Sequence, residues 1–459
     1  MKSKVIIMIL KIYFHTKELL LLSALLISGA LYAQNPFIKD QFTADPSARV
    51  FNGKVYLFPS HDIISPLEPE NKWFCMEDYH VFSSENLVDW TDNGIIVTQN
   101  KAPWVREDSY AMWAPDAIEK NGKFYFYFPA SAKPEFGRGF MVGVAIADKP
   151  EGPYTIVDKP IAGATGIDPC PFINKDGQAY LYWCGRGMWV AKLKPNMIEL
   201  DGEPQQIQGL PEGGGLKEGP FVFQRNGIYY FTYPWVKNNT TELLYYCMGD
   251  NPMGPFKDGG VIMDESPTGC WTNHHSFIEF KGQWYLFYHH NDYSPDFDKN
   301  RSARIDSVTF NPDGTIQKVI PTLRGVGITD AKKEIRIDRY TSKSDSDVII
   351  TFINPTKPFE GWKTILSKSG GWIRYNSVDF GQGALSKAKA LVYSARGGSF
   401  AIQAGKSVEA PVIAKIDVPA SGKWSLIEVK MSAKVKGIQD IFVTLEGNNP
   451  VQIKWISFE

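Results

Sequence analysis

Five side chains that can do acid–base chemistry or stack on a sugar ring stand at nearly the same distance before a repeated glycine. Counting back eight or nine residues from each glycine gives Asp45, Trp113, Asp168, Glu218 and His274. Carboxyl groups that converge on one place raise one another's pKa, which is costly unless the charges serve a purpose. A neutral carboxylic acid beside an ionised carboxylate is the pair that cleavage of a glycosidic bond by water requires.

Four of these residues also have an ordinary structural explanation. An Asp before Pro, as at Asp45 and Asp168, is most often a turn residue that caps its own backbone. Glu218 precedes Gly-Pro and is open to the same explanation, and a tryptophan such as Trp113 in a strand is most often part of the core. The shared position in all five repeats favours one common site over five separate turns.

The glycines belong to an internal repeat that supplies the elements needed to position these side chains. A glycine in a tight turn followed by an aromatic run predicts a β-hairpin, because such turns require positive φ. Successive glycines lie 69, 55, 50 and 55 residues apart, close to the roughly 40–50 residues of one propeller blade. The five hairpin segments are residues 52–57, 121–126, 176–181, 226–231 and 281–286.

Five repeats predict an all-β chain that contains a five-bladed β-propeller. The first strand of each blade lines the axis of a propeller, so the residues ahead of each hairpin should face a common centre. We assign the propeller to residues 34–325. A β-rich region without the repeat, residues 332–459, is predicted to form a second domain, a β-sandwich of the jelly-roll type.

Composition and charge argue against several classes of partner. The 459 residues carry a net charge of −1 and no long basic run, so neither nucleic acid nor an anionic membrane surface is expected as a partner. Aromatic side chains are abundant, with 13 Trp, 21 Tyr and 28 Phe, which suits a protein that stacks rings on sugars. The five cysteines are scattered, so we expect small buried hydrophobic residues rather than a thiolate metal site.

The N-terminus has the pattern of an export signal, predicted over residues 1–33. Positively charged lysines precede an apolar stretch at residues 19–31, and Ala33 fits a cleavage site. A membrane anchor is the alternative, but the apolar run is short for a span of about 20 residues. We therefore expect a periplasmic or extracellular protein with no membrane span in the mature chain.

Five ordered motifs surround the repeated positions: Thr43-Ala44-Asp45-Pro46-Ser47, Met112-Trp113-Ala114-Pro115-Asp116, Gly166-Ile167-Asp168-Pro169, Lys217-Glu218-Gly219-Pro220 and Asn273-His274-His275-Ser276. Together they resemble glycoside hydrolase family 43 over about residues 36–325. The resemblance implies that Asp45 is the general base and Glu218 the general acid. It also implies that Asp168 raises the pKa of Glu218 and holds it in place. The family inverts anomeric configuration, so base and acid should lie about 6.5–9.5 Å apart.

The same resemblance gives roles to three more residues. Arg301 matches an arginine that reaches the sugar pocket, and Trp113 would form a wall of that pocket. His274 matches a histidine near the propeller axis, which in relatives ligates a water-bound cation, such as a structural calcium, or simply fills the channel. No cofactor is required for the chemistry, because acid–base hydrolysis needs only water and matched pKa values.

A long segment in the first repeat, residues 59–79, is expected to narrow the pocket. It carries His61, Asp62 and Trp73, of which we predict His61 to contact substrate. Long loops on a propeller face usually shape binding sites. A narrow pocket favours removal of one terminal or branching sugar over cleavage inside a chain.

The C-terminal region resembles a family 6 carbohydrate-binding module. The resemblance rests on residues 370–381, 400–403 and 453–458, and alternating patterns at residues 414–418 and 427–431 independently predict half-buried strands. Lys454 stands where an acid is expected, which argues against the calcium site that this family often has. Trp372 and Trp455 are expected in the core, and a purely structural domain is the alternative to a working binding module.

These observations lead to one favoured function and several alternatives. We expect an exo-acting α-L-arabinofuranosidase on side chains of arabinoxylan or arabinan. A β-xylosidase acting on xylan follows, since it uses the same three carboxyl groups, and an endo-acting arabinanase or xylanase comes next. Galactan is a further substrate of the family. A carbohydrate-binding propeller without catalysis is disfavoured by the intact Asp45, Asp168 and Glu218.

Overall fold

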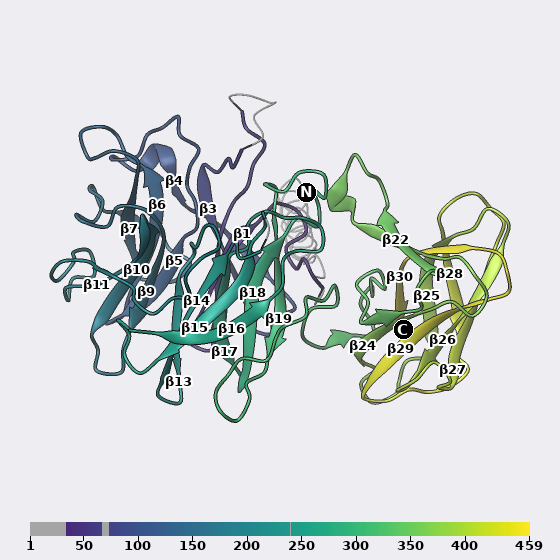
Figure 1. Ribbon diagram of the computed structural model, residues 1–459. Coiled ribbons are helices and arrows are strands. Elements are labelled where there is room, and N and C mark those ends of the chain that lie inside the picture. The colour runs from purple at the N-terminus through teal and green to yellow at the C-terminus, as the bar shows by residue number, and fades with distance from the viewer. Residues whose placement is uncertain (1–33, 67–72, 239) are drawn as a thin grey trace, which may run out of the picture. The chain divides into compact units, whose positions relative to one another are not determined.

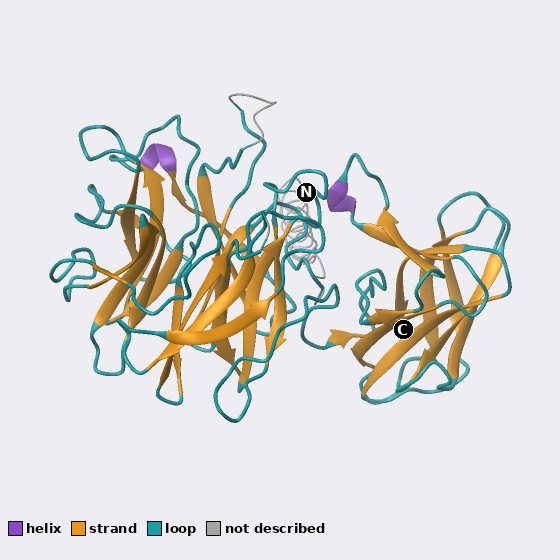
Figure 2. Cartoon of the chain, in the orientation of Figure 1, coloured by secondary structure: helices purple, strands orange, loops and turns teal. Residues whose placement is uncertain are grey.

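A computed structural model describes residues 34–66, 73–238 and 240–459, and its regular secondary structure is almost entirely β-strand (Figures 1 and 2). Within these residues the helical structure amounts to two single 3-10 turns, η1 (Gln99–Lys101) and η2 (Pro358–Glu360). None of the described helices is long and apolar enough to cross a membrane. The signal predicted at residues 1–33 lies outside the described residues.

The first five sheets take their strands in chain order, as propeller blades do. The first blade contains β1 (Ala44–Phe51), β2 (Lys54–Ser60), β3 (Asp78–Ser84) and β4 (Thr91–Thr98). The second contains β5 (Asp116–Lys120), β6 (Lys123–Ser131), β7 (Phe140–Ala147) and β8 (Thr155–Ile156). The third contains β9 (Ile167–Ile173), β10 (Ala179–Gly185), β11 (Gly187–Lys192) and β12 (Gln205–Gln206).

The last two blades complete the set of five. The fourth contains β13 (Phe221–Arg225), β14 (Ile228–Trp235), β15 (Leu243–Gly249) and β16 (Lys257–Met263). The fifth has three strands, β17 (His275–Phe280), β18 (Gln283–His290) and β19 (Ser302–Val308). The predicted five-bladed architecture is confirmed, and in the described part of the chain the fifth sheet is one strand narrower than the others.

The repeated glycines join the first and second strands of every blade, as predicted. In four blades the residue before the glycine also has positive φ, the signature of a type I′ turn. The third blade differs, because Asp176 is outside that region and the turn is closed instead by Asn174, whose carbonyl accepts the N–H of the glycine. The five glycines have φ between 75° and 85°: Gly53, Gly122, Gly177, Gly227 and Gly282.

The first strands of the blades surround a common axis, which the side chain of Arg49 crosses. From β1 its guanidinium pairs with Asp116 at the start of β5 and donates to the carbonyl oxygen of Pro171 on β9, 3.3 Å away. It also lies over the ring of Phe221 on β13, 4.8 Å from the centroid. Ser276 on β17 bonds the backbone of β1 at two points, which closes the ring of blades.

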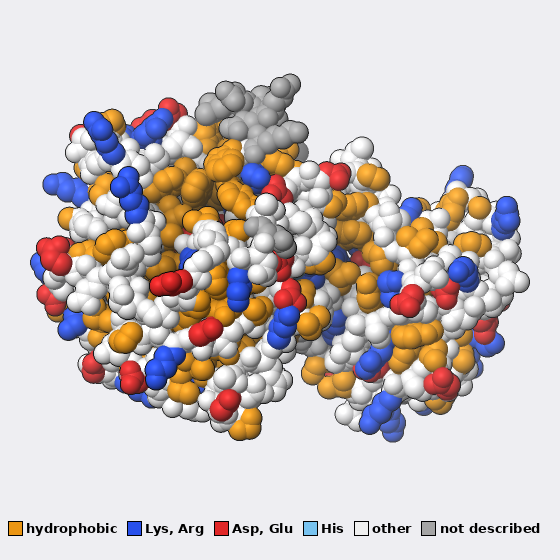
Figure 3. All heavy atoms as spheres, viewed as in Figure 1, with side chains coloured by type: hydrophobic (Ala, Val, Ile, Leu, Met, Phe, Trp, Pro, Cys, Tyr) orange, Lys and Arg blue, Asp and Glu red, His pale blue; other side chains and the backbone are white. Residues whose placement is uncertain are grey.

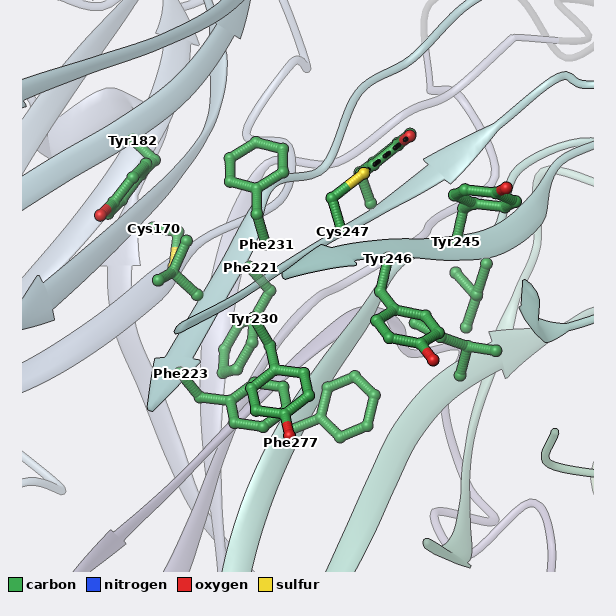
Figure 4. Packing of buried hydrophobic residues seen from close by; sticks show 14 of the residues in the cluster. Cys170, Tyr182, Phe221, Phe223, Tyr230, Phe231, Tyr245, Tyr246, Cys247 and Phe277 are labelled. Carbon is green, nitrogen blue, oxygen red and sulfur yellow. Dashed lines mark hydrogen bonds between the residues drawn. The ribbon is translucent and has the colours of Figure 1, made fainter. Parts of the chain in front are cut away.

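Aromatic side chains fill the space between blades, which explains the aromatic runs of the repeat. Phe223 on β13 stacks on Tyr230 of the same blade at 4.6 Å between ring centroids and meets Phe277 of the fifth blade at 4.9 Å (Figure 4). Cys170 and Cys247 lie in this cluster. All five cysteines are buried, as expected from the sequence, and all five are free.

Two larger sheets follow in the C-terminal region. One contains β20 (Thr329–Asp330), β21 (Ser342–Lys343), β24 (Trp372–Asp379), β26 (Gly398–Ala404), β27 (Val412–Val418) and β29 (Ile438–Glu446). The other contains β22 (Val348–Phe352), β23 (Trp362–Leu366), β25 (Lys387–Tyr393), β28 (Ser425–Lys430) and β30 (Val451–Phe458). Both sheets contribute to one buried aliphatic core, as a sandwich requires. The first sheet already begins at β20, a few residues before position 332.

The two tryptophans expected in the sandwich core are only partly buried. Alternation along β24 places Ile373 and Tyr375 inward and Trp372 on the opposite face. Trp455 on β30 is likewise half-buried, whereas the following Ile456 is fully buried. On the face drawn in Figure 3, acidic and basic side chains are interspersed, in keeping with a net charge near zero.

Candidate active site

A cavity of about 230 Å³ lies among the segments that lead into the first strands of the blades. Six of the seven side chains predicted for the site line it together: Asp45, Trp113, Asp168, Glu218, His274 and Arg301. They come from all five blades, which explains why no short stretch of sequence contains the whole site. The wall is completed by Trp73, Phe74, Met76, Ala114, Ile167, Leu216, Trp271, Thr272 and Asn273.

Asp45 and Asp168 occupy equivalent, strained positions in their blades. Both have positive φ, 44° and 56°, although each precedes a proline and is not glycine. The pairing register shifts at both places, so each aspartate sits in a bulge of its first strand. Bulges re-aim a side chain, and backbone strain of this kind gathers at functional sites. The Asp-Pro steps therefore direct carboxyl groups toward the cavity, and they are not ordinary capping turns.

The carboxylate of Asp45 is held ionised by its surroundings. Arg301 donates from Nη1 to Oδ1 at 2.8 Å, and the hydroxyl of Ser60 donates to Oδ2 at 2.7 Å. Burial alone would raise the pKa of Asp45, but the charge of Arg301 outweighs burial and lowers that pKa to about 2. Asp45 is therefore a carboxylate throughout the physiological pH range.

Arg301 is itself fixed by a second carboxylate, Asp62. The guanidinium donates from Nε and Nη2 to the two oxygens of Asp62, at 2.9 Å and 2.8 Å, and Phe74 lies against it at 4.8 Å. The backbone N–H of Arg301 also donates to Asp62. A bidentate pair of this kind fixes the plane of the guanidinium, so the third nitrogen is aimed at Asp45.

His289 on β18 accepts a hydrogen bond from the backbone of Asp45, and the sequence analysis did not identify this residue. The backbone N–H of Asp45 donates to Nδ1 of His289 at 3.0 Å, while Nε2 lies 3.0 Å from the carbonyl oxygen of Thr272. Burial lowers the pKa of His289 to about 3, with Arg301 adding to the effect. The ring is therefore neutral, with its proton on Nε2, and it holds the strained backbone of Asp45 in place.

The surroundings of Asp168 and Glu218 raise the pKa of a carboxyl group, whereas those of Asp45 lower it. Burial raises the pKa of Asp168 well above its ordinary value, and the neighbouring charge of Glu218 raises it further. The carboxylate oxygen Oδ2 accepts the backbone N–H of Gly219 at 2.8 Å, so Asp168 holds the segment that carries Glu218. Burial also raises the pKa of Glu218 well above its ordinary value, and the next largest contribution comes from Glu242. Glu218 is therefore suited to keep a proton.

The structure adds two further residues to the site, Glu242 and Asn273, which the sequence analysis did not assign to it. Glu242, directly before β15, is fully buried beside Glu218. Asn273 is 1% exposed and lines the cavity, yet neither its side-chain nitrogen nor its oxygen has a hydrogen-bond partner among the described residues. Unpaired buried polar atoms are costly, so Asn273 is suited to a polar ligand. Its place beside His274 in the last motif was the one available hint.

An aromatic group forms one wall of the cavity. Phe74 and Trp271 are stacked at 5.8 Å between centroids, and Trp73, about half exposed, lies 5.9 Å from Trp271. The ammonium of Lys299 lies over all three rings at 5.4–5.8 Å. Exposed aromatic faces suit the apolar faces of sugar rings, and the segment predicted to narrow the pocket does contribute Trp73 and Phe74 to its wall.

The structure does not bring His61 to the cavity, in contrast to our prediction. Its Nδ1 lies 2.7 Å from Oδ1 of Asp78, and its ring meets His80 edge-on. His61, Asp78 and His80 offer ligand atoms within 4.8 Å of one another. His80, however, pairs through Nδ1 with Asp92, so the cluster is satisfied by its own hydrogen bonds. The neighbouring Asp62 points the other way and reaches the site through Arg301.

The family resemblance gives His274 one of two roles, contact with a water-bound cation or filling of the propeller axis. Burial lowers the pKa of His274, so the ring is neutral, and Nδ1 lies 3.9 Å from Oδ1 of Asp45. Calcium takes about six to eight oxygen ligands. The nearby carboxylates are already engaged, Asp45 with Arg301 and Ser60, and Asp116 on the axis with Arg49. His274 thus presents a neutral ring beside Asp45, and a cation bound there would take most of its oxygen ligands from water.

Comparison with protein families gives two matches. The model for glycosyl hydrolases family 43 matches residues 33–316, and the model for carbohydrate binding module family 6 matches residues 341–459. A xylosidase/arabinosidase 43A from Humicola insolens is 37% identical over 330 residues, which cover 61% of this chain and 98% of that protein. An arabinoxylan arabinofuranohydrolase from Bacillus subtilis is 28% identical over 477 residues, covering 90% and 89%.

Solved structures of family 43 enzymes are also similar to this chain. A family 43 β-xylosidase/α-arabinofuranosidase from a compost metagenome, determined with xylotriose in a calcium-free form, has a TM-score of 0.56 and 34% identity. It covers 62% of this chain and 97% of its own. An arabinoxylan arabinofuranohydrolase of Bacillus subtilis, determined with cellotetraose, has a TM-score of 0.53 and 25% identity, covering 92% and 97%.

Proposed function

Because the chain belongs to the glycosyl hydrolases of family 43, we propose that it is an exo-acting, inverting pentosidase on arabinoxylan and xylan. It releases terminal α-L-arabinofuranosyl units and, with the same machinery, β-D-xylopyranosyl units. Similarity to proteins named xylosidase/arabinosidase and arabinoxylan arabinofuranohydrolase supports both sugars. The observation that carries the proposal is the meeting of Asp45, Asp168 and Glu218 in one small cavity.

Asp45 acts as the general base in this proposal. Its carboxylate, with a pKa of about 2, is ionised at any working pH and accepts a proton from the water that attacks the anomeric carbon. Arg301 and Ser60 each occupy one oxygen of the carboxylate and so fix its orientation. Attack by water from the side opposite the leaving group inverts the anomeric centre.

Glu218 acts as the general acid. Its raised pKa keeps the carboxyl group protonated, so that it can donate to the glycosidic oxygen as the bond to the anomeric carbon breaks. Asp168 positions the segment through the N–H of Gly219. The contrast between a lowered pKa at Asp45 and raised pKa values at Glu218 and Asp168 is the separation that acid–base catalysis requires.

The size and lining of the cavity support exo action. Its volume of about 230 Å³ lies below the roughly 300–1,000 Å³ of pockets for drug-sized ligands, which suits a single pentose. Asn273 would pair its free amide with hydroxyl groups of that pentose. Trp73 and Trp271 would stack on the sugar that follows in the chain.

Export and polysaccharide targeting complete the proposal. The charged and apolar N-terminal sequence supports secretion, which a plant polysaccharide substrate requires because such polymers do not enter cells. The module at residues 341–459 would keep the catalytic domain near its polymer.

Hydrolysis of two aryl glycosides tests this function. Wild type and Glu218→Gln are assayed on 4-nitrophenyl α-L-arabinofuranoside and β-D-xylopyranoside, with release of arabinose and xylose from arabinoxylan followed in parallel. We expect activity on both, lost in the variant by about 10²-fold or more on the polymer. Absence of monosaccharide release, or undiminished activity of Glu218→Gln, would reject the proposal.

A further inference from the structure

Glu242 is a buried carboxyl group that none of the catalytic motifs contains. It stands directly before β15, and its side chain is fully buried. The backbone N–H of Asn273 donates to Oε2 at 2.8 Å, and the backbone N–H of Glu242 donates to the carbonyl oxygen of Trp271 at 2.9 Å. Asn273 and Trp271 both line the cavity. Glu242 is thus hydrogen-bonded to the backbone of two residues of the cavity wall.

The partner of this carboxyl group is the proposed general acid. The carboxyl group of Glu218 lies beside that of Glu242, and Oε1 of Glu242 is buried without a hydrogen-bond partner among the described residues. Two carboxyl groups can form a hydrogen bond only when at least one of them carries a proton. The ion pairs of the site go instead to Asp45 and Asp62, through Arg301. A buried pair of carboxyl groups without a cation of its own retains a proton.

We propose that Glu242 is a positioning residue for Glu218: it holds the carboxyl group of the acid by a hydrogen bond and keeps it protonated at neutral and mildly alkaline pH. The inference rests on the proposed function, in which Glu218 is the acid. Asp168 then positions the backbone after Glu218, while Glu242 positions its carboxyl group. The acid is held from two sides, by one residue from the third blade and one from the fourth.

The electrostatics of the pair agree with this division. Burial raises the pKa of Glu242 to about 8, while the proposed hydrogen bond with Glu218 pulls that value down. The same bond raises the pKa of Glu218. As pH rises through about 8, Glu242 loses its proton first, and its charge then opposes ionisation of Glu218. The other charged or titratable groups that act on the pair are Asp45, Asp168, Cys184 and Arg301.

The test compares leaving groups and pH in Glu242→Gln. Glutamine keeps the size and a hydrogen bond, but it donates an N–H to Glu218 and never carries a negative charge, so the acid ionises more easily. We expect the alkaline limb of kcat/KM to move down by about one pH unit. We also expect kcat on a glycoside with a poor leaving group, such as the methyl glycoside, to fall by about tenfold. Activity on the 2,4-dinitrophenyl glycoside, which needs no protonation, should stay within about threefold.

Control variants separate this role from a structural one. Glu203→Gln, at an exposed glutamate, should match wild type in every measurement. Glu242→Asp retracts the carboxyl group from Glu218, and it should move the alkaline limb down by a smaller amount, which provides the test if Glu242→Gln does not fold. An unmoved limb, or an equal loss on both leaving groups in the folded variants, would overturn the inference. If Glu218→Gln retains activity on the poor leaving group, the acid assignment itself fails. Loss in Glu218→Gln with a normal Glu242→Gln would overturn the inference alone.

Discussion

Two buried arginine–carboxylate systems lie along the propeller, and they differ in what they face. Arg49 and Asp116 bind one another across the axis, and neither lines the cavity. Arg301 binds Asp45 and Asp62, and both Arg301 and Asp45 do line it. Asp116 begins a regular strand, whereas Asp45 has a φ of 44° in a bulge. The Arg49–Asp116 ion pair therefore holds the ring of blades together, whereas the ion pair of Arg301 with Asp45 keeps the proposed base ionised.

Separate neutralisation of the two aspartates should give the largest difference between the two systems. Asp45→Asn removes the base and should lower kcat on aryl glycosides by about 10²–10⁴-fold, with little loss of thermal stability. Asp116→Asn should unfold at a lower temperature but keep near wild-type kcat per folded molecule. Activity assays with thermal denaturation of both proteins make the comparison. Equal loss of activity in both would mean that the two systems are not distinct.

Removal of Arg49 should have the largest effect on stability. Arg49→Met leaves Asp116 as an uncompensated buried charge, at a cost of about 3–5 kcal/mol in the free energy of unfolding. Urea denaturation measures this. Arg49→Met/Asp116→Leu removes both charges and should recover part of the loss. If the single variant is as stable as wild type, the axial pair does not hold the blades together.

The residues that lie in the repeat could be predicted from the sequence, whereas site residues between the repeats could not. The repeat placed Asp45, Trp113, Asp168, Glu218 and His274 correctly in one cavity, because its period locates the start of each first strand. Between the repeats, the position of a side chain depends on the path of its loop, which the period of the repeat does not predict. Glu242 reaches the site only because the start of β15 bonds the segment before β17.

The first-blade loop shows the same limit at two adjacent residues. Nothing in the sequence distinguishes His61 from Asp62 as the residue that reaches the site, and the side chains of such neighbours point in different directions. Asp62 fixes Arg301, whereas His61 pairs with Asp78 outside the cavity. In the C-terminal sandwich the alternation of residues was readable, but the choice of which tryptophans are buried was not.

The role of Arg301 in lowering the pKa of Asp45 predicts a shift in pH dependence. With a pKa of about 2, Asp45 stays ionised in acid, so the acid limb of kcat/KM in wild type should lie well below pH 4. Arg301→Met removes the opposing charge and leaves burial to act, so the limb should move up by about two pH units. Arg49→Met should leave it unmoved. A limb that does not respond to Arg301→Met would contradict the assignment of Asp45.

Asn273 should give the smallest of these effects. Asn273→Ala removes one side chain proposed to bind sugar hydroxyl groups, so KM should rise by about tenfold, equal to 1–2 kcal/mol. Stability should not fall, because its amide has no partner among the described residues in the absence of sugar. Asn449→Ala, at an exposed position, serves as the matched control. An unchanged KM would mean that the amide does not contact substrate.

The stereochemistry of the first product tests the central claim most directly. Proton NMR of an aryl glycoside during the first minutes of hydrolysis identifies the anomer released before mutarotation. If Asp45 activates water while Glu218 protonates the leaving group, the β-D-xylopyranoside yields α-xylose first. Release of β-xylose first would show a covalent intermediate on the enzyme and contradict the assignment of Asp45 as a base acting through water.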